Sequence, residues 1–195
     1  MLTTMKTKVD ILRMAYILPR MKSKLSSTWQ AEFRGLFFGE GYIGVTKNGK
    51  GRRGTGPEYT ARLQITLRDD DAEVIYDIQK KLGGTIHRER RGRLAISANG
   101  NPTQIKPYIV WRTRSFNDVR RIIHILEGGE LPSRKREQLK IMHRFLRTQS
   151  LLGNGRELSA KYAAIKRRVG QIRESCWEKL IELHSYKHTV GGIIT

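Results

Sequence analysis

Hydrophobic and polar positions follow two different periods along residues 27–68, and the changes of period predict one helix and two strands. The first apolar run has helical spacing and begins at Ser27, which forms an S-x-x-Q capping box with Gln30. Gly41 follows as the residue past the helix end. Strands are predicted at 42–47 and 59–68, joined by a basic, glycine-rich loop.

The strand at 59–68 alternates most regularly, so its two faces can be assigned separately. One face is apolar and belongs to a core: Ala61, Leu63, Ile65 and Leu67. The other face is polar: Thr60, Arg62, Gln64, Thr66 and Arg68. Arginine and glutamine donors suit phosphates and base edges. An ordinary solvated face is the alternative interpretation.

Residues 70–129 continue with a helix, two strands and a further helix. Asp70 with Glu73 predicts the start of a second helix, whose apolar stripe is Val74, Ile75, Ile78 and Leu82 and which ends at Gly83. Two more strands are predicted at 85–91, with 93–97 as a continuation, and at 106–113. Ser115 and Asp118 cap a third helix with the stripe Val119, Ile122, Ile123 and Leu126. Helix, two strands, helix, two strands, helix is the order of an α+β domain with one antiparallel sheet.

Two further helices are predicted after this unit. The first, at 133–147, turns Leu139, Met142, Phe145 and Leu146 inward. The second, at about 156–187, has an apolar stripe at steps of three and four residues: Tyr162, Ile165, Val169, Ile172, Cys176, Leu180 and Leu183. The predicted organisation is therefore a basic N-terminal arm at 1–26, a core at 27–150 and a C-terminal helical extension packed on the core at 151–195.

Charge points to a polyanionic partner. The 195 residues include 38 Lys and Arg against 18 Asp and Glu, a net charge of +20, and each phosphate that such a surface neutralises releases counterions. The 38% hydrophobic content argues for a globular chain. A single cysteine, Cys176, excludes an intrachain disulfide and predicts an intracellular, reducing compartment. Apolar runs are too short for a membrane span, so no membrane partner is expected.

Residues 33–41 break two local rules of helix formation. Gly35 and Gly39 lie four apart on one helix face, and each costs ~1 kcal/mol relative to Ala unless another backbone approaches closely. Glu40 places a negative charge in the last helical turn, where the helix dipole disfavours it by ~0.3–1 kcal/mol. A bound divalent cation would reverse that penalty.

With Gly35, Gly39, Gly41, the apolar Leu36 and Phe37, and the acid Glu40, this stretch resembles the motif of the LAGLIDADG homing endonucleases. It departs from the usual motif at Phe33, Arg34 and Phe38. The resemblance implies an αββαββα core whose saddle-shaped antiparallel sheet lies in the DNA major groove, followed here by additional C-terminal helices. It also implies two motif helices packed side by side, with their terminal acids binding metal over the DNA.

One motif without a second copy then predicts a homodimer and a pseudo-palindromic DNA target. The dimer interface would include Gly35, Phe38 and Gly39. Each Glu40 would hold Mg²⁺, with Mn²⁺ or Ca²⁺ as alternatives, together with the Gly39 carbonyl. Family enzymes add a polar residue near the end of the second strand, where this chain has Leu67, so Gln64 or Thr66 would order the attacking water.

The predicted catalytic residues are Glu40, Lys135 and Gln64. Lys135 matches the lysine that family enzymes carry early in a later helix, with Arg134 as the alternative; simple phosphate contact is the other role open to either cation. The predicted DNA contacts are Lys47, Lys50, Arg52, Arg53, Arg62, Gln64, Thr66, Arg68, Arg88, Arg90, Arg93 and Arg112.

The function expected from these features is a site-specific, metal-dependent DNA endonuclease that leaves 3′ overhangs and promotes intron homing. The alternatives are an RNA maturase of the same fold, with intron RNA as its partner, a non-cleaving DNA-binding regulator, and a basic ribosome-associated protein. Gly39–Gly44 spells G-x-G-x-x-G but follows a helix, the reverse of the nucleotide-binding context. His184 and His188 lack the further ligands of a metal site.

Overall fold

The computed structural model describes residues 25–50, 57–89, 93–96, 102–152 and 160–185. Within these ranges the main helices are α2 (Ser27–Glu40), α3 (Ala72–Leu82), α4 (Phe116–Leu126), α5 (Ser133–Leu151) and α6 (Ala160–Ser185). The strands are β1 (Gly41–Lys50), β2 (Pro57–Arg68), β3 (Thr85–Glu89), β4 (Arg93–Ile96), β5 (Pro102–Ile105) and β6 (Tyr108–Thr113). None of the helices in these ranges is long and apolar enough to cross a membrane.

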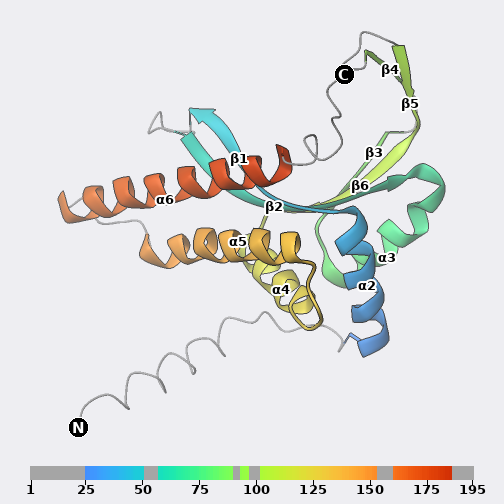
Figure 1. Ribbon diagram of the computed structural model, residues 1–195, viewed down its shortest axis with the longest axis horizontal. Coiled ribbons are helices and arrows are strands. Elements are labelled where there is room, and N and C mark those ends of the chain that lie inside the picture. Colours follow the sequence, from blue (N-terminus) through green and yellow to red (C-terminus); the bar gives the residue numbers. More distant parts are fainter. Residues whose placement is uncertain (1–24, 51–56, 90–92, 97–101, 153–159, 186–195) are drawn as a thin grey trace, which may run out of the picture.

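Four strands form one antiparallel sheet in the order β1-β2-β6-β3 (Figure 1). The register pairs Tyr42 with Gln64 across β1 and β2, and Gln64 with Arg112 across β2 and β6. This sheet and the helices between its strands confirm the predicted α+β class. The region after β3 was predicted incorrectly: 93–96 does not continue β3 but pairs with β5 in a separate two-stranded sheet.

Helices cover one face of the four-stranded sheet and bury its apolar positions. Ala61, Leu63 and Ile65 of β2 are fully buried, as the alternation predicted. Trp111 of β6 is also buried, and its indole Nε1–H donates to the Gly83 carbonyl at 2.7 Å, where α3 ends. Gly83 and Gly84 have φ values of 73° and 89°, which glycine adopts without steric cost. The sheet therefore has one packed face and one face whose side chains are available for contacts.

The C-terminal helix α6 lies against α5 and β1 (Figure 1). Val169, Cys176 and Leu180 of its predicted stripe are buried. Arg173 places its guanidinium near the rings of Phe116 and Phe145 and donates to the Thr148 hydroxyl at 2.8 Å. Burial among these rings lowers the pKa of Arg173.

Two predicted helix caps were wrong and one was right. Ser26, not Ser27, caps α2 by accepting from the Trp29 N–H, and Gln30 donates to the Leu25 carbonyl instead. Before α3, residues 69–71 form a 3₁₀ turn, and no acid side chain caps the helix. Val74 on α3 is 43% exposed, outside the buried stripe. Ser115 does cap α4, accepting from the Asp118 N–H.

Candidate active site

Glu40 is the last residue of α2, and its side chain is exposed where the chain enters β1 directly. Gly41 makes this abrupt change with φ −79° and ψ 142°, and its N–H bonds the Phe37 carbonyl. A Cβ at Gly41 would lie 2.3 Å from the Phe37 carbonyl oxygen and 2.6 Å from the Phe37 ring. Only glycine fits this contact, which sets the acid at the end of the sheet.

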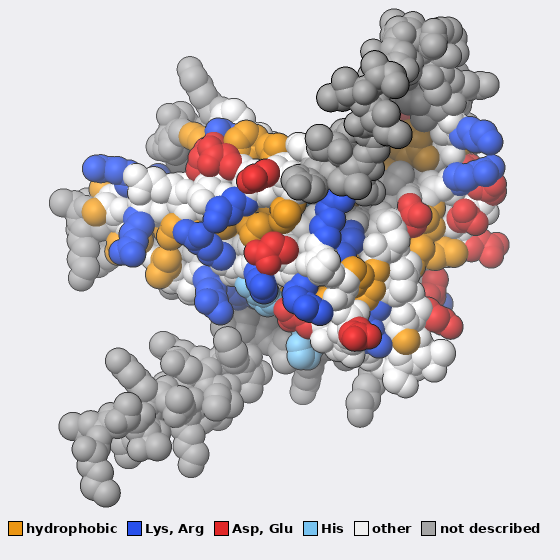
Figure 2. All heavy atoms as spheres, viewed as in Figure 1, with side chains coloured by type: hydrophobic (Ala, Val, Ile, Leu, Met, Phe, Trp, Pro, Cys, Tyr) orange, Lys and Arg blue, Asp and Glu red, His pale blue; other side chains and the backbone are white. Residues whose placement is uncertain are grey.

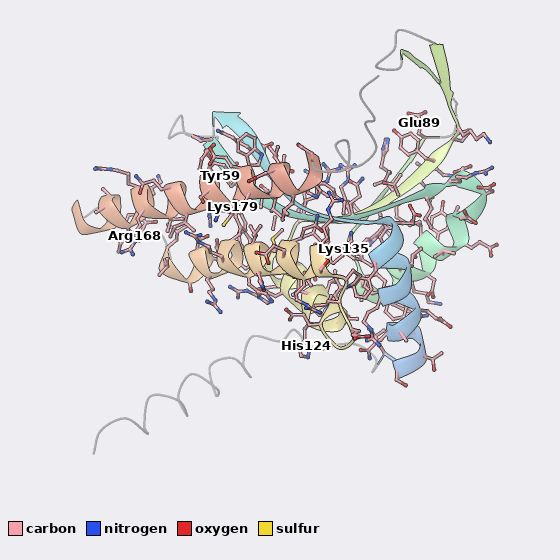
Figure 3. The ribbon with its side chains drawn as sticks, viewed as in Figure 1. Tyr59, Glu89, His124, Lys135, Arg168 and Lys179 are labelled. Atoms are coloured by element: carbon pink, nitrogen blue, oxygen red, sulfur yellow. The ribbon has the colours of Figure 1, made fainter. Side chains whose placement is uncertain are left out.

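Lys135 joins Glu40 at this corner from a distant part of the sequence. It lies in the first turn of α5, at the junction of α2 and β1 (Figure 3). Its ammonium group donates a hydrogen bond to the Gly41 carbonyl and lies 5.6 Å from the centre of the Phe37 ring. We call Gly39, Glu40, Gly41 and Lys135 the acid corner. Arg134, the alternative cation, instead donates to the Leu183 carbonyl in the last turn of α6.

A row of polar side chains runs along β2 next to the acid corner. The Arg62 guanidinium donates to the Gln64 amide oxygen, and the Gln64 amide nitrogen donates to the Thr66 hydroxyl at 2.9 Å. We call Arg62, Gln64 and Thr66 the polar row. Gln64 is opposite Tyr42, two residues after Glu40. Leu67, by contrast, lies on the helix-covered face and packs against the core.

Arginine side chains gather on this face of the sheet, close enough to Arg62 to affect its pKa. Burial, followed by the charge of Arg112, lowers the pKa of Arg62, and Arg114 adds to the effect. The Nε atoms of Arg62 and Arg112 are buried and have no hydrogen-bond partner among the described residues. Buried donors without acceptors are costly, so an anionic ligand that reached them would be favoured.

Two predicted DNA contacts lie on the opposite, helix-covered face. Lys47 is 2.6 Å from the Glu174 carboxylate of α6, and its ammonium lies 4.6 Å from the centre of the Trp177 ring. Arg88 forms a bidentate pair with Asp69, which raises the pKa of Arg88. Strand alternation explains both positions, because Lys47 has the parity of buried Ile43 and Val45, and Arg88 is paired with buried Ile109. Neither residue lies on the face of the sheet that carries the polar row, which we call the polar face.

Of the other predicted DNA contacts, some lie within the described residues and some lie outside them. Arg68 lies at the end of β2 in an exposed ion pair with Asp70, at 2.9 Å. Arg52, Arg53 and Arg90 lie outside the described residues, as does most of the predicted basic arm at 1–26. Lys50 and Arg93 are described only by their strand positions, in β1 and β4.

Several side chains on the polar face were not predicted from the sequence. Tyr42 and Thr46 of β1, His87 of β3 and Tyr108 of β6 share it by register with the polar row and Arg112. Alternation along each strand shows which of its residues share a face. The strand register is needed to show which face of one strand continues the polar face of the next.

The glycines of α2 leave one helix face open. A Cβ added at Gly35 or Gly39 would meet no atom within 4 Å. Phe38, the third predicted interface residue, is half-buried and packs in part against the core. Arg34, which departs from the usual motif, donates to the Ile125 carbonyl at 3.4 Å and so points toward α4.

Metal-binding side chains are sparse. Among the described residues, no group of three or more His, Cys, Asp or Glu side chains is placed to hold a metal ion. At the acid corner, Glu40 is the carboxylate available to bind a metal ion. A divalent ion bound there would also need oxygen ligands from another molecule.

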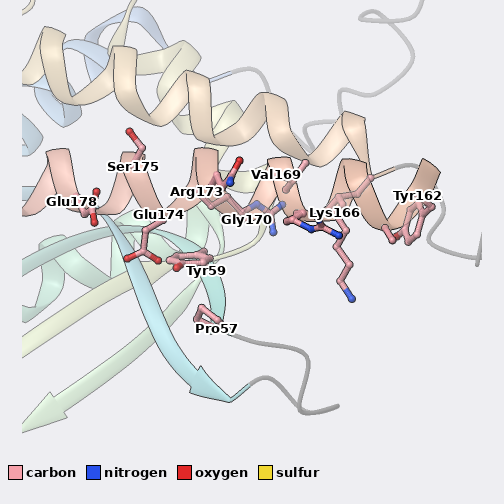
Figure 4. Close-up of a pocket in the computed structure, with 14 residues that line it drawn as sticks. Pro57, Tyr59, Tyr162, Lys166, Val169, Gly170, Arg173, Glu174, Ser175 and Glu178 are labelled. Atoms are coloured by element: carbon pink, nitrogen blue, oxygen red, sulfur yellow. The ribbon is translucent and has the colours of Figure 1, made fainter. Parts of the chain in front are cut away.

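A groove of about 770 Å³ lies away from the acid corner, between α6 and the start of β2 (Figure 4). Tyr59, Lys166, Glu174 and Glu178 are among its lining residues. On the face shown in Figure 2, Lys and Arg side chains gather over α5 and α6. The groove contains no side chain of the acid corner or the polar row.

The LAGLIDADG endonuclease family model matches residues 33–145, so the chain belongs to the LAGLIDADG endonuclease family. The match includes the acid corner, the polar row and the four-stranded sheet. A comparison with curated protein sequences found no match.

Solved LAGLIDADG homing endonucleases share the fold. I-GzeII in complex with its DNA target is 17% identical, with a TM-score of 0.52 over 76% of this chain and 44% of that one. I-SmaMI bound to cleaved DNA is 13% identical, with a TM-score of 0.52 over 88% and 51%. I-LtrWI bound to target DNA is 15% identical, with a TM-score of 0.50 over 80% and 46%. The chain spans about half the length of these three enzymes.

Proposed function

We propose that this chain is a metal-dependent homing endonuclease that acts as a homodimer and cuts both strands of a long pseudo-palindromic DNA target, leaving 3′ overhangs. The observation that carries the proposal is the acid corner. An exposed carboxylate ends a helix whose glycine face is open, and a lysine from a remote helix is held beside it. A phosphodiester bound on the polar face next to this corner would meet both an acid and a cation.

The open glycine face supports the homodimer. Gly35 and Gly39 cost the isolated helix stability and make no close contact within the described part of the chain. A second α2 helix packed there would recover that cost through close backbone approach. A two-fold axis at this contact would also bring two Glu40 carboxylates together over one target.

The oxygen donors of the acid corner fit a magnesium ion. Glu40 supplies a carboxylate, and the Gly39 carbonyl is among the last four of α2, which lack ordinary intrahelical partners. When bound, the metal would lower the pKa of an attacking water and stabilise charge on the leaving oxygen. DNA phosphates, water and the second subunit would supply the remaining ligands.

The chain's own side chains would orient and stabilise the reacting groups. Lys135, held by the Gly41 carbonyl, presents a positive charge that stabilises the developing negative charge on the phosphate. Gln64 would orient a water molecule, and its hydrogen bonds with Arg62 and Thr66 support this role by fixing the amide. Arg62 and Arg112 would contact the DNA with their guanidinium groups.

The test compares two exposed acids of α2. The full-length chain is incubated with DNA spanning the intron insertion site, with and without Mg²⁺. We expect Glu40→Gln to reduce cleavage by about a hundredfold or more while retaining DNA binding in Ca²⁺. Glu32→Gln, on the same helix, should cut as the unaltered chain does.

Failure to cut the authentic target with Mg²⁺ would refute the nuclease proposal. If the protein instead accelerates splicing of the host intron RNA, the maturase alternative replaces it. Equal activity of the Glu40→Gln and Glu32→Gln variants would remove Glu40 from the reaction.

A further inference from the structure

His184 in the last turn of α6 forms an aromatic stack with Tyr42 of β1. Their ring centroids are 4.6 Å apart, and the ring planes differ by 19°. The Tyr42 ring extends over Gly44, where a Cβ would lie 2.3 Å from the tyrosine oxygen. The tyrosine therefore lies between the glycine of its own strand and the histidine of α6.

Tyr42 connects the acid corner to the polar row. It is two residues from Glu40 in the chain and directly follows Gly41, whose carbonyl binds Lys135. The Arg62 guanidinium lies 5.9 Å from the centre of the Tyr42 ring. A change in the direction of Tyr42 would therefore displace both groups.

The surroundings of His184 favour a neutral ring. Burial, followed by the charges of Arg134 and Lys135, lowers the pKa of His184. Its buried Nε2 has no hydrogen-bond partner among the described residues. Hydrogen bonds between the ring and the backbone of Ile43 and Leu180 act in the opposite direction but are weaker influences than burial. The stack with Tyr42 is the side-chain contact that links this ring to β1.

Helix α6 is held in place by other contacts. Cys176 and Leu180 are buried, Glu174 pairs with Lys47, and Arg134 binds the Leu183 carbonyl. Loss of the His184 ring would leave these contacts intact. A role in holding α6 to the core is therefore not enough to explain a histidine at this position.

We propose that His184 is a positioning residue for DNA cleavage: by stacking on Tyr42 it fixes the start of β1, so that Glu40, the Gly41–Lys135 contact and the polar row stay aligned. This inference rests on the function proposed above. His184 itself touches no reacting atom. The effect of its stack should appear as a difference in the cleavage rate of the bound complex between variants of equal stability.

The experiment uses the full-length chain and three variants. His184→Leu removes the aromatic stack with similar bulk, His184→Phe keeps an aromatic ring, and Ile181→Ala truncates an exposed residue of the same helical turn. Single-turnover cleavage is measured with Mg²⁺ and saturating protein, DNA affinity with Ca²⁺, and stability by thermal unfolding.

We expect His184→Leu to slow cleavage of bound DNA by about tenfold, from the typical value of an aromatic pair, with an affinity change of less than about twofold. His184→Phe should restore the rate, and Ile181→Ala should leave it unchanged. The two His184 variants should melt alike, because both remove the unpaired buried nitrogen and the ring's hydrogen bonds with the backbone of Ile43 and Leu180, and only the aromatic stack differs between them.

Two cleavage results would each overturn the proposal: cleavage by His184→Leu at the unaltered rate, or an equal loss of rate in His184→Leu and His184→Phe. A loss of rate that parallels a fall in melting temperature would also overturn it, since that is the mark of a structural role. Failure of the unaltered chain to cut with Mg²⁺ is a different outcome and refutes the nuclease function itself. NMR spectra of labelled tyrosine check the stack directly, because the Tyr42 ring signals should move in His184→Leu and stay near their positions in His184→Phe.

Discussion

Replacing Gly35 and Gly39 by alanine should stabilise the single chain and impair the dimer. Both glycines lie in α2, and an added Cβ meets nothing within 4 Å at either site. Each substitution therefore recovers about 1 kcal/mol of helix propensity without a steric cost. The double variant gains about 2 kcal/mol, which corresponds to a melting temperature about 4–8 °C higher for a chain of this size.

The same two methyl groups should oppose dimer formation. If two α2 helices meet along this face, each Cβ would enter the contact between them, and overpacking of this kind costs about 1–3 kcal/mol. Dimer affinity should then fall about 5- to 150-fold, and DNA cleavage at limiting protein concentration should fall with it.

Thermal unfolding of the dilute protein measures the first effect, and sedimentation velocity with and without target DNA measures the second. Thr28→Ala is the matched control, because it also adds helix propensity at an exposed site of α2. A double variant that is more stable yet dimerises and cuts normally would show that the helices do not meet at these glycines. A double variant that melts earlier would show that the glycines are needed inside the chain.

Three further substitutions test the acid corner and the acid dependence of stability. Gly41→Ala should destabilise the chain by about 1–3 kcal/mol in urea unfolding, since its Cβ collides with Phe37; unchanged stability would contradict the close contact. Lys135→Met should slow single-turnover cleavage by about a hundredfold with little change in DNA affinity; an equal loss of affinity would instead indicate phosphate contact alone. The hydrogen bond from Lys81, reinforced by one from the Trp29 indole, lowers the pKa of Asp77, so its contribution is present above the ordinary pKa of aspartate and is lost as pH falls below it. Asp77→Asn should therefore melt earlier near pH 7, and the difference from the unaltered chain should shrink toward pH 3; a constant difference would contradict this linkage.

Much of the fold follows from local patterns. The alternation of β2 correctly placed Ala61, Leu63 and Ile65 in the core, because a strand buries every second residue. Capping was less predictable, since Ser26 and Ser27 are adjacent and either could supply the hydroxyl. β5 is four residues long and begins with a proline, so its pattern was too short to recognise.

Part of the candidate site also follows from local patterns, and part depends on tertiary contacts. Glu40 and the paired glycines were identified from the sequence because they violate local helix preferences within nine residues, and the motif itself pointed to the family. The neighbours of Glu40 depend on contacts between distant parts of the chain. Lys135 meets Gly41 across 94 residues, and Lys47 meets Glu174 across 127.

The sequence by itself determined the class of fold, the motif helix and its acid. Only the tertiary structure decided which cations lie near that acid, which arginines share the polar face, and that His184 reaches Tyr42. The physical reason is that periodicity and helix preferences act over a few residues along the chain. Ion pairs, stacks and strand register depend on how elements far apart in sequence pack against each other.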